Sequence, residues 1–527
     1  LMTKTSIVLI TATLLAGALV LPLLMGAGDE RTITVAELRD KIAGGWAGQM
    51  IGVSYGAPTE FRAQGRLLED KEIPAWSTER ISNALNQDDL YVDMTFAKVL
   101  DDKGLDATTE DFGAMFREAR YGLWHANLAA RRNLKRGVPA KLSGTPQYNA
   151  HANDIDFQIE ADFIGMMTPG LPLAATDIAW RAGRVMNYGD GIYGGIFVSC
   201  MYATAFFESD PRKIVEAGLA CLPAKSPYAQ IISDVLKWHK EQPGDWIAVW
   251  NQVQKKWDQR DPCPSGALRP FNIDAKLNGA YIALGLLYGG GDMEKTLNIS
   301  TRCGQDSDCN PSSAAGILGV VMGYSKIPDI WKSGIPAIAD KKFAYTDYSF
   351  NSIVDSNQKR ALAMIMRNGG RLDGETIRVK TQSPRPTRLE VWDDYGSPVE
   401  RIPVTDSRWK WSEGWNAASP EERRKAPAPR WSAQKGAEAS VTFQGTGVIL
   451  VGPYLANGGT ADVYLDGKLQ KTVDVCSDEK SNKGNESIWH AFKLPNRQHT
   501  LRIVVRGEPY GNSTSADVGI EDLVVFR

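Results

Sequence analysis

The sequence predicts a multidomain protein in which an all-α domain is followed by an all-β sandwich. Helical periodicity runs from about residue 34 to residue 368, and several of the helices are apolar nearly all round. The glycines of Asn368-Gly369-Gly370 then end this pattern. Beyond residue 437, short segments alternate apolar and polar residues, which is typical of half-buried strands.

Composition limits the kinds of partner. The chain has 527 residues, of which 43% are hydrophobic, so it can bury large cores in two or three domains. Sixty basic and 62 acidic residues give a net charge of -2, so the chain has no overall positive electrostatic field that would attract nucleic acid or anionic membranes. We therefore expect no nucleic-acid partner and no stable membrane partner apart from the N-terminal segment.

The N-terminal segment resembles an export signal. Met2-Thr3-Lys4 leads into an uncharged run from Ile7 to Gly26, which predicts a signal peptide over residues 1–27. The alternative is a retained anchor, because the run is almost long enough to span a bilayer. We expect an exported protein, periplasmic or extracellular. Six scattered cysteines without a CxxC pattern predict at most one disulfide bond.

The predicted helical domain covers residues 28–370. Its apolar helices have no polar face and must be surrounded by other helices, so they form the centre of a compact body. The clearest examples are residues 194–207, 228–239, 277–288 and 312–324.

Two β regions follow the helices. Residues 371–436 contain strand-like segments and a stretch rich in Trp, Pro, Arg and Ser, which predicts linking strands and a long decorated loop. Residues 437–527 contain six short strand patterns, and Asp466-Gly467 predicts a hairpin because both positions tolerate positive φ. This last region looks like the jelly-roll, galactose-binding-like domains of exported glycan-active enzymes; it could bind carbohydrate or brace the helical domain.

Acidic side chains occur in three separate segments of the helical region. A glycine-rich turn after a helix presents Glu60, a second helix begins at Asp88-Asp89, and Asp306 and Asp308 lie in a loop before the helix that Pro311 starts. Each pair alone would be ordinary helix capping. If the segments meet, their hard oxygen ligands suit Mg²⁺, Ca²⁺ or Mn²⁺.

Together with the helices that accompany them, these segments resemble the ADP-ribosylglycohydrolase family over about residues 42–325. The resemblance implies an all-α fold that holds divalent metal, usually a pair of Mg²⁺ ions, between the acidic segments. Glu60 matches the glutamate that ends the family's first motif. Asp88 and Asp89 match its Thr-Asp-Asp motif, and Asp306 and Asp308 match its late Asp-x-Asp-Thr motif.

Three positions depart from the family pattern. Gln87 and Cys309 replace the two threonines, and Val53 stands where the first motif usually carries Asp. An amide oxygen can substitute for a hydroxyl, but a thiol binds Mg²⁺ poorly. The resemblance implies one or two ions, with Mg²⁺ expected and Ca²⁺ or Mn²⁺ as alternatives, and Glu60 orienting or deprotonating water. The implied ligands are Asp88, Asp89, Asp306, Asp308 and Gln87.

A fourth acidic segment has no match in the typical family. On a helix, Asp156 and Glu160 would share one face at i,i+4, with Asp162 about 120° from Glu160. One interpretation is a solvated acidic face. The other is that Asp156 or Glu160 is a catalytic proton donor lining the pocket and that Asp162 binds substrate.

Further substrate-binding candidates are aromatic or lie in a glycine-rich loop. Tyr188, Asp190 and Tyr193 surround the glycines before a buried helix, and Trp124 could form a cleft wall. Helix capping and core packing are the alternatives. His125 and His151 are expected to be surface or packing residues.

These observations lead to one main hypothesis and two alternatives. The main hypothesis is an exported, divalent-metal-dependent hydrolase that cleaves a glycosidic bond in a furanoside-containing carbohydrate or glycoconjugate. The first alternative is a hydrolase of ADP-ribosyl proteins or ADP-ribose conjugates. The second is a non-catalytic glycan-binding protein with a structural Ca²⁺ site.

Overall fold

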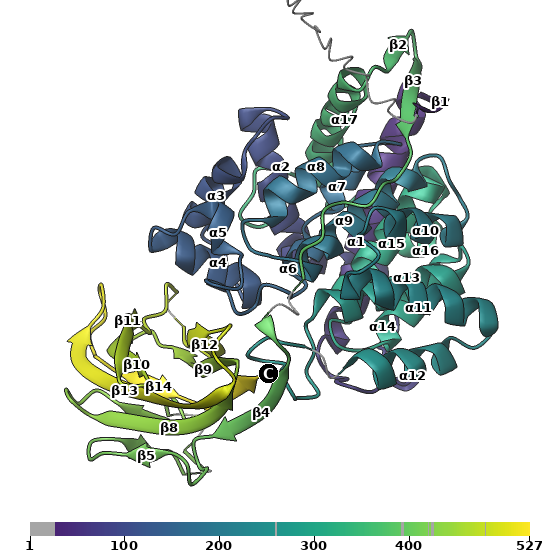
Figure 1. The fold of residues 1–527 in the computed structure, drawn as a ribbon. Helices are drawn as coiled ribbons and strands as arrows, with labels where there is room; N and C mark the ends of the chain where they lie inside the picture. Colours follow the sequence, from purple (N-terminus) through teal and green to yellow (C-terminus); the bar gives the residue numbers. More distant parts are fainter. Residues whose placement is uncertain (1–26, 259–260, 392–394, 420, 423–425, 480) are drawn as a thin grey trace, which may run out of the picture.

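The computed structural model describes residues 27–258, 261–391, 395–419, 421–422, 426–479 and 481–527, in which a helical body lies beside a smaller β domain (Figure 1). The predicted signal peptide falls almost entirely outside these residues. Within them, no helix combines the length and the apolarity needed to cross a bilayer. All six cysteines are free thiols, so the single disulfide bond considered from the sequence does not form.

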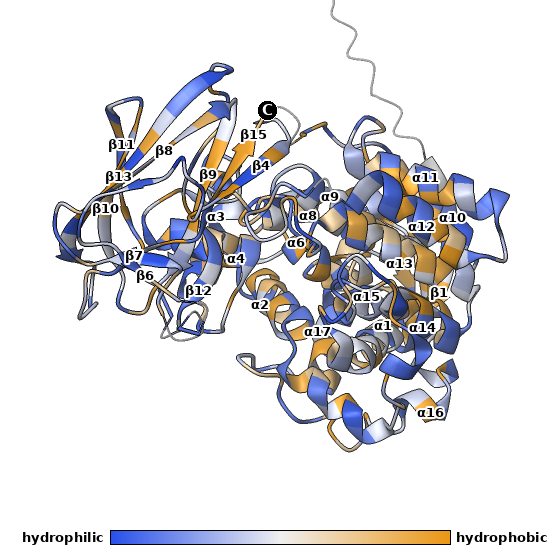
Figure 2. Cartoon of the chain, turned by 90° about the horizontal axis from the view of Figure 1, so that it is seen from below, coloured by the Kyte–Doolittle hydropathy of each residue, from blue (hydrophilic) through white to orange (hydrophobic). Residues whose placement is uncertain are grey.

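Four buried helices form the centre of the helical body. They are α1 (Val35–Gly56), α9 (Asp190–Ala205), α13 (Ala275–Gly289) and α15 (Cys309–Met322). Nearly every residue of α9 and α13 is buried, which confirms the prediction of helices without a polar face. Outer helices such as α11 (Pro227–Glu241) carry one hydrophobic and one hydrophilic face instead (Figure 2). The other long helices are α2 (Asp88–Lys103), α3 (Thr109–Glu118), α4 (His125–Lys135), α8 (Pro172–Gly183), α10 (Pro211–Ala220), α12 (Trp246–Trp257), α14 (Met293–Arg302) and α17 (Phe350–Arg367).

Helices α1 and α15 are in direct backbone contact through a row of glycines on α1. A Cβ at any of these glycines would lie only 2.0–2.2 Å from a carbonyl oxygen of α15 or of the loop before it. Residues four apart lie on one face of a helix, so the row runs along the whole contact. The two helices are antiparallel, and the end of α1 therefore lies against the loop that carries Asp306 and Asp308. The row consists of Gly44, Gly48, Gly52 and Gly56, which face Gly319, Ala315, Pro311 and Ser307.

A small sheet ties the N-terminal end of the helical body to the segment that follows it. Strand β1 (Ala27–Thr34) pairs antiparallel with β3 (Thr376–Gln382), which also pairs with β2 (Arg371–Asp373). The sequence predicted strands after residue 370 but not β1.

The β domain consists of antiparallel sheets with strand orders β11-β10-β13-β8-β5 and β12-β9-β15-β4, plus a small sheet β14-β7-β6. The two-residue hairpin between β10 and β11 has φ of 51° at Asp466 and 80° at Gly467, as predicted. The sheets include β4 and β5, which precede residue 437. The strands are β4 (Pro398–Pro403), β5 (Lys410–Trp411), β6 (Asn416–Ala417), β7 (Arg430–Ser432), β8 (Glu438–Gly445), β9 (Gly447–Tyr454), β10 (Gly459–Leu465), β11 (Lys468–Asp474), β12 (Lys483–Ala491), β13 (Arg497–Pro509), β14 (Val518–Ile520) and β15 (Asp522–Phe526).

Arginines of α4 and of the position directly after it hold the β domain in place. Arg132 and Arg136 both bind the Asp474 carboxylate, and Arg131 Nη2 lies 2.7 Å from Glu479 Oε1. The arginine side chains are largely buried, so these pairs are better shielded from solvent than ordinary surface ion pairs. The docking brings the start of β12 to the edge of the helical body.

Candidate active site

A cleft of about 870 Å³ lies between the helical body and β12. Its helical side carries acidic and aromatic residues, and its opposite side is the segment Asn482–Glu486. The helical lining includes Glu60, Gln87, Asp88, Tyr91, Trp124, His125, Asn127, Asp156, Phe271, Asp306 and Cys309.

The three acidic segments that match the family motifs meet at this cleft. Glu60 directly follows α1 and the short helix η1 (Ala57–Thr59), and Asp88 and Asp89 are the first residues of α2. Asp306 and Asp308 lie in the loop before α15. The glycine contact between α1 and α15 explains why Glu60 lies beside this loop.

The carboxyl groups of this cluster are close together at largely buried positions, where like charges repel one another. Burial, followed by the neighbouring Asp308 and Asp88 carboxyls, raises the pKa of Glu60 to about 8. Burial and nearby acids also raise the pKa of Asp308 to about 6 and hold the pKa values of Asp89 and Asp306 well above the usual range.

Several oxygens of the cluster have no protein partner. Asp89 Oδ1, Asp306 Oδ1 and Asp308 Oδ1 are buried and accept no hydrogen bond. Buried unpaired carboxylate oxygens are costly, and a divalent cation would satisfy them. The donor set is made of oxygen atoms, so it fits a hard cation such as Mg²⁺ or Ca²⁺.

The two substituted motif positions both border the cleft. Cys309 Sγ donates to Asp89 Oδ2 at 3.3 Å, so the thiol orients a carboxylate rather than presenting an oxygen ligand. Gln87 precedes α2, and its side chain makes no capping hydrogen bond there. Its amide is therefore free to face the cleft, where the residue lies.

The fourth acidic segment is buried, so the interpretation as a solvated face is wrong. Its residues do not form one helix, because α6 (Asp156–Ile159) ends before Glu160 and α7 (Asp162–Met166) is separate. Asp156 lines the cleft, whereas Glu160 is 1% exposed and Asp162 is 0% exposed, and neither borders the cleft. Asp162 is close to Asp93 and away from the cleft surface, so its predicted role in substrate binding stays a prediction.

Asp156 is held by the start of α4. Its Oδ1 accepts the backbone N–H of Asn127 at 3.0 Å, and its Oδ2 accepts that of Ala126 at 3.2 Å. Burial outweighs these hydrogen bonds and raises the pKa of Asp156 to about 7. Glu160 accepts a hydrogen bond from the side chain of Asn127 and so also contacts the first turn of α4.

Three predicted substrate-binding residues lie elsewhere. Tyr188 contacts Arg184 on another face of the molecule, and the Tyr193 hydroxyl donates to the carbonyl oxygen of Arg388. Asp190 is 2% exposed and accepts the backbone N–H of Tyr228 at 3.1 Å. The glycine-rich loop therefore does not border the cleft beside the acidic cluster, and sugar binding by this loop stays a prediction.

Trp124 lines the cleft, as predicted, and is 50% exposed. Lys483 of β12 lies over its ring, with Nζ 4.2 Å from the ring centroid. The sequence did not reveal the wall formed by residues 482–486, because no local pattern indicates which strand end will dock against a distant helix. His125, expected to be a surface or packing residue, also lines the cleft.

Comparison with known proteins agrees with the fold and the motifs. A family model described as ADP-ribosylglycohydrolase matches residues 34–357. The chain belongs to the ADP-ribosylglycohydrolase family. Family members are hydrolases and are typically metal-dependent, and the acidic cluster lies within the matched residues.

Other similarities are weaker. The protein named "A type blood alpha-D-galactosamine galactosaminidase", from Flavonifractor plautii, is 27% identical over 182 residues, which is 34% of this chain and 16% of that protein. A solved structure titled "ADP-ribosylglycohydrolase-related protein complex" is 16% identical and covers 62% of this chain and 99% of its own, with a TM-score of 0.39. The CBM36-1 domain of a xylanase from the hindgut metagenome of Trinervitermes trinervoides is 13% identical and covers 24% of this chain and 94% of its own, with a TM-score of 0.18. At these TM-scores neither structure supports an inference about this chain.

Proposed function

We propose that this chain is an exported, divalent-metal-dependent hydrolase that cleaves a glycosidic bond in a furanoside-containing carbohydrate or glycoconjugate. The observation that carries the proposal is the meeting of five carboxyl groups from three distant segments, of which Glu60, Asp88 and Asp306 border an open cleft. Family membership supports the hydrolase class.

The residues of the acidic cluster fit a hard divalent cation. Asp88, Asp89, Asp306 and Asp308, with the Gln87 amide, would hold it, and Mg²⁺ is the expected ion, with Ca²⁺ or Mn²⁺ as alternatives. Such an ion would bind sugar hydroxyls and neutralise the charge of the cluster.

Two carboxyl groups of the chain then carry the proton transfers. Glu60, whose pKa of about 8 in the metal-free cluster would fall beside a bound cation, takes a proton in its ionised form from the water whose oxygen forms the new bond to the anomeric carbon. Asp156 gives its proton to the glycosidic oxygen as the bond from that oxygen to the anomeric carbon breaks. Of the two donor candidates, Asp156 is favoured because it borders the cleft and has a pKa of about 7, so it carries a proton near neutral pH. Glu160 has no access to the cleft.

The preference for a carbohydrate rests on the cleft walls. Trp124 presents a half-exposed ring that can stack on a sugar, and residues 482–486 add amide and charged groups for hydroxyls. The partial similarity to a galactosaminidase is in keeping with a sugar substrate. Hydrolysis of ADP-ribosyl conjugates is the second candidate, and the family match favours it.

The test is a substrate screen with the purified chain. After treatment with chelator, the protein is assayed on ADP-ribosyl-arginine and on a panel of furanosides, with and without added Mg²⁺. We expect Mg²⁺-dependent turnover of a furanoside, lost in Asp306→Asn and kept in Asp329→Asn, whose carboxylate is 90% exposed on the surface. Turnover confined to ADP-ribosyl-arginine would select the second candidate, and turnover unaffected by Asp306→Asn would contradict the proposed site.

A further inference from the structure

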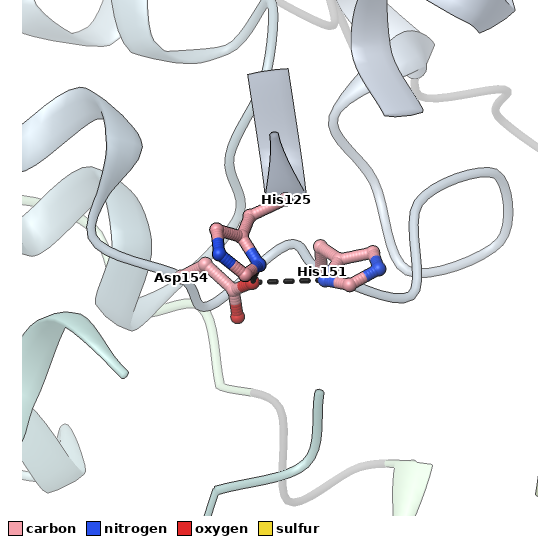
Figure 3. Close-up of side chains that lie close together, drawn as sticks. All are labelled: His125, His151 and Asp154. Atoms are coloured by element: carbon pink, nitrogen blue, oxygen red, sulfur yellow. Dashed lines mark hydrogen bonds and ion pairs between the residues drawn. The ribbon is translucent and has the colours of Figure 1, made fainter. Parts of the chain in front are cut away.

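Two histidines and an aspartate lie together beside the cleft, outside the acidic cluster. His125 begins α4, while His151 and Asp154 lie in the loop before α6. Both imidazole Nδ1 atoms face Asp154 Oδ2, at 3.6 Å from His125 and 2.9 Å from His151 (Figure 3). The side chains of Asp154 and His151 are buried, whereas 20% of the His125 side chain is exposed at the cleft.

Glu486 of β12 lies on the far side of His151. Its Oε2 is 3.2 Å from His151 Nε2, an ion-pair distance at which neither atom makes a hydrogen bond. A carboxylate beside Nε2 keeps a proton on that nitrogen, as carboxylates do behind metal-binding histidines. With the proton on Nε2, the lone pair of Nδ1 points at Asp154 Oδ2 only 2.9 Å away, a contact that is stabilised by a second proton on the ring or by a metal ion that both atoms bind.

Hydrogen bonds do not satisfy all the polar side-chain atoms of His125, His151 and Asp154. His125 Nδ1 and Asp154 Oδ1 are buried without a hydrogen-bond partner, and 3.6 Å is too long for a hydrogen bond from His125 to Asp154 Oδ2. An extra proton on His151 would satisfy only one of the two contacts. In a tetrahedral site with bonds of about 2.0 Å, ligand atoms lie about 3.3 Å apart, and the two observed distances bracket this value.

We propose that His125, His151 and Asp154 bind Zn²⁺ or a similar transition-metal ion, with the Glu486 carboxylate beside His151 Nε2. Imidazole ligands suit such ions, whereas the all-oxygen cluster suits Mg²⁺ or Ca²⁺. Three protein ligands leave the fourth position of the tetrahedron for water or a substrate atom, on the side where His125 reaches the cleft. Because Glu486 belongs to β12, this site also connects the β domain to the helical body.

The test uses the full chain, stripped with chelator and titrated with ZnCl₂ alone. Bound zinc is measured by elemental mass spectrometry after gel filtration, and stabilisation is measured by thermal denaturation. We expect one retained zinc per chain and a higher Tm. His125→Ala should weaken zinc binding at least about 10-fold, and Glu486→Gln about 10- to 100-fold. The matched control His239→Ala removes a histidine from a different surface and should keep full binding.

Two further variants separate this proposal from the proposed hydrolase function. Asp306→Asn should retain zinc, because Asp306 belongs to the other cluster. Asp154→Asn should lose it, and circular dichroism checks that each variant is folded. Wild-type protein that retains no zinc, or zinc that is lost in Asp306→Asn but kept in His125→Ala, would overturn the proposal and leave the hydrolase test unaffected.

Discussion

Asp156 combines a buried position with access to the cleft. Two backbone N–H groups at the start of α4 fix its carboxyl group. Burial raises the pKa of this group to about 7. An asparagine has a similar shape and lacks the transferable proton, but its NH₂ group cannot accept a hydrogen bond, so it keeps only one of the two backbone N–H contacts.

Asp156→Asn should lower kcat by about 10²- to 10⁴-fold on furanosides with alkyl leaving groups. The loss should be much smaller on a nitrophenyl furanoside, because nitrophenolate leaves without protonation. Steady-state kinetics on both substrates measures the difference, and Asp329→Asn is the surface control. An equal loss on both substrates would contradict the role of proton donor.

The site residues that could be predicted from sequence are those with a local motif. Glu60, Asp306 and Asp308 follow or precede recognisable helix ends, and the structure brings them together. Asp190 occupies an equally suggestive glycine-rich loop but binds the backbone of Tyr228, because the same acid-at-a-helix-start pattern serves capping and catalysis alike. His151 carries no recognisable motif: Asp154 follows it by three residues in a loop, and Glu486 reaches it only after the domains dock.

The pair α1 and α15 is the element on which the acidic cluster depends. A methyl group at Gly48 would lie 2.1 Å from the Ala315 carbonyl oxygen, and backbone atoms on both sides leave it no room. Overpacking of this kind costs about 1–3 kcal/mol or more.

Gly48→Ala should therefore lower the free energy of unfolding by at least about 1–3 kcal/mol and weaken Mg²⁺ binding, because the separated helices move Glu60 away from Asp306. Urea denaturation of the metal-free protein and Mg²⁺ titration by thermal shift measure the two effects. At Gly244 nothing lies within 4 Å of an added Cβ, so Gly244→Ala is the matched control and should be close to wild type.

The turn between β14 and β15 carries a partly buried acid, Glu521, whose Oε2 accepts the Asn485 N–H at 2.8 Å. Burial, and secondarily Asp522, raises the pKa of Glu521 from 4.5 to about 7. The folded state then binds this proton more tightly than the unfolded state does, so this group makes the free energy of unfolding fall as the pH rises from 4.5 to about 7.

Glu521→Gln should remove this decrease in the free energy of unfolding between pH 4.5 and about 7. The difference in unfolding free energy between variant and wild type should change by about 1–3 kcal/mol across this pH range, with the variant gaining relative stability towards pH 7. Urea denaturation at a series of pH values measures it. Parallel curves for the two proteins would show that Glu521 has an ordinary pKa.

For the whole molecule, the succession of a helical domain and an antiparallel β domain could be predicted, because periodicity changes sharply near residue 370. The way in which the two domains dock could not be predicted from the sequence. It depends on Arg132 and Arg136 meeting Asp474, and on the Arg132 guanidinium lying 3.9 Å from the centre of the Tyr454 ring. Single charges scattered over the sequence carry no sign of such pairing.

Arg132→Met should lower the stability by up to about 3 kcal/mol, the lower end of the cost of breaking a buried pair, because Arg136 still contacts Asp474. The KM for substrate should rise more than kcat falls, since β12 would shift while the carboxylates stay in place. Thermal denaturation and steady-state kinetics measure the two effects. Arg506→Met, which removes an exposed pair with Glu508, is the control; a variant of Arg132 with the same Tm and KM would contradict this role of docking.

The division of the cleft between two domains separates reactivity from selectivity. The acids that would cleave the bond are fixed by helix packing and tolerate little change, whereas the facing segment 482–486 belongs to the start of a strand and the loop before it. Replacement of this short stretch, or of the whole β domain, would give a new choice of substrate without rebuilding the reactive centre. Directed evolution of altered glycan preference should therefore begin there.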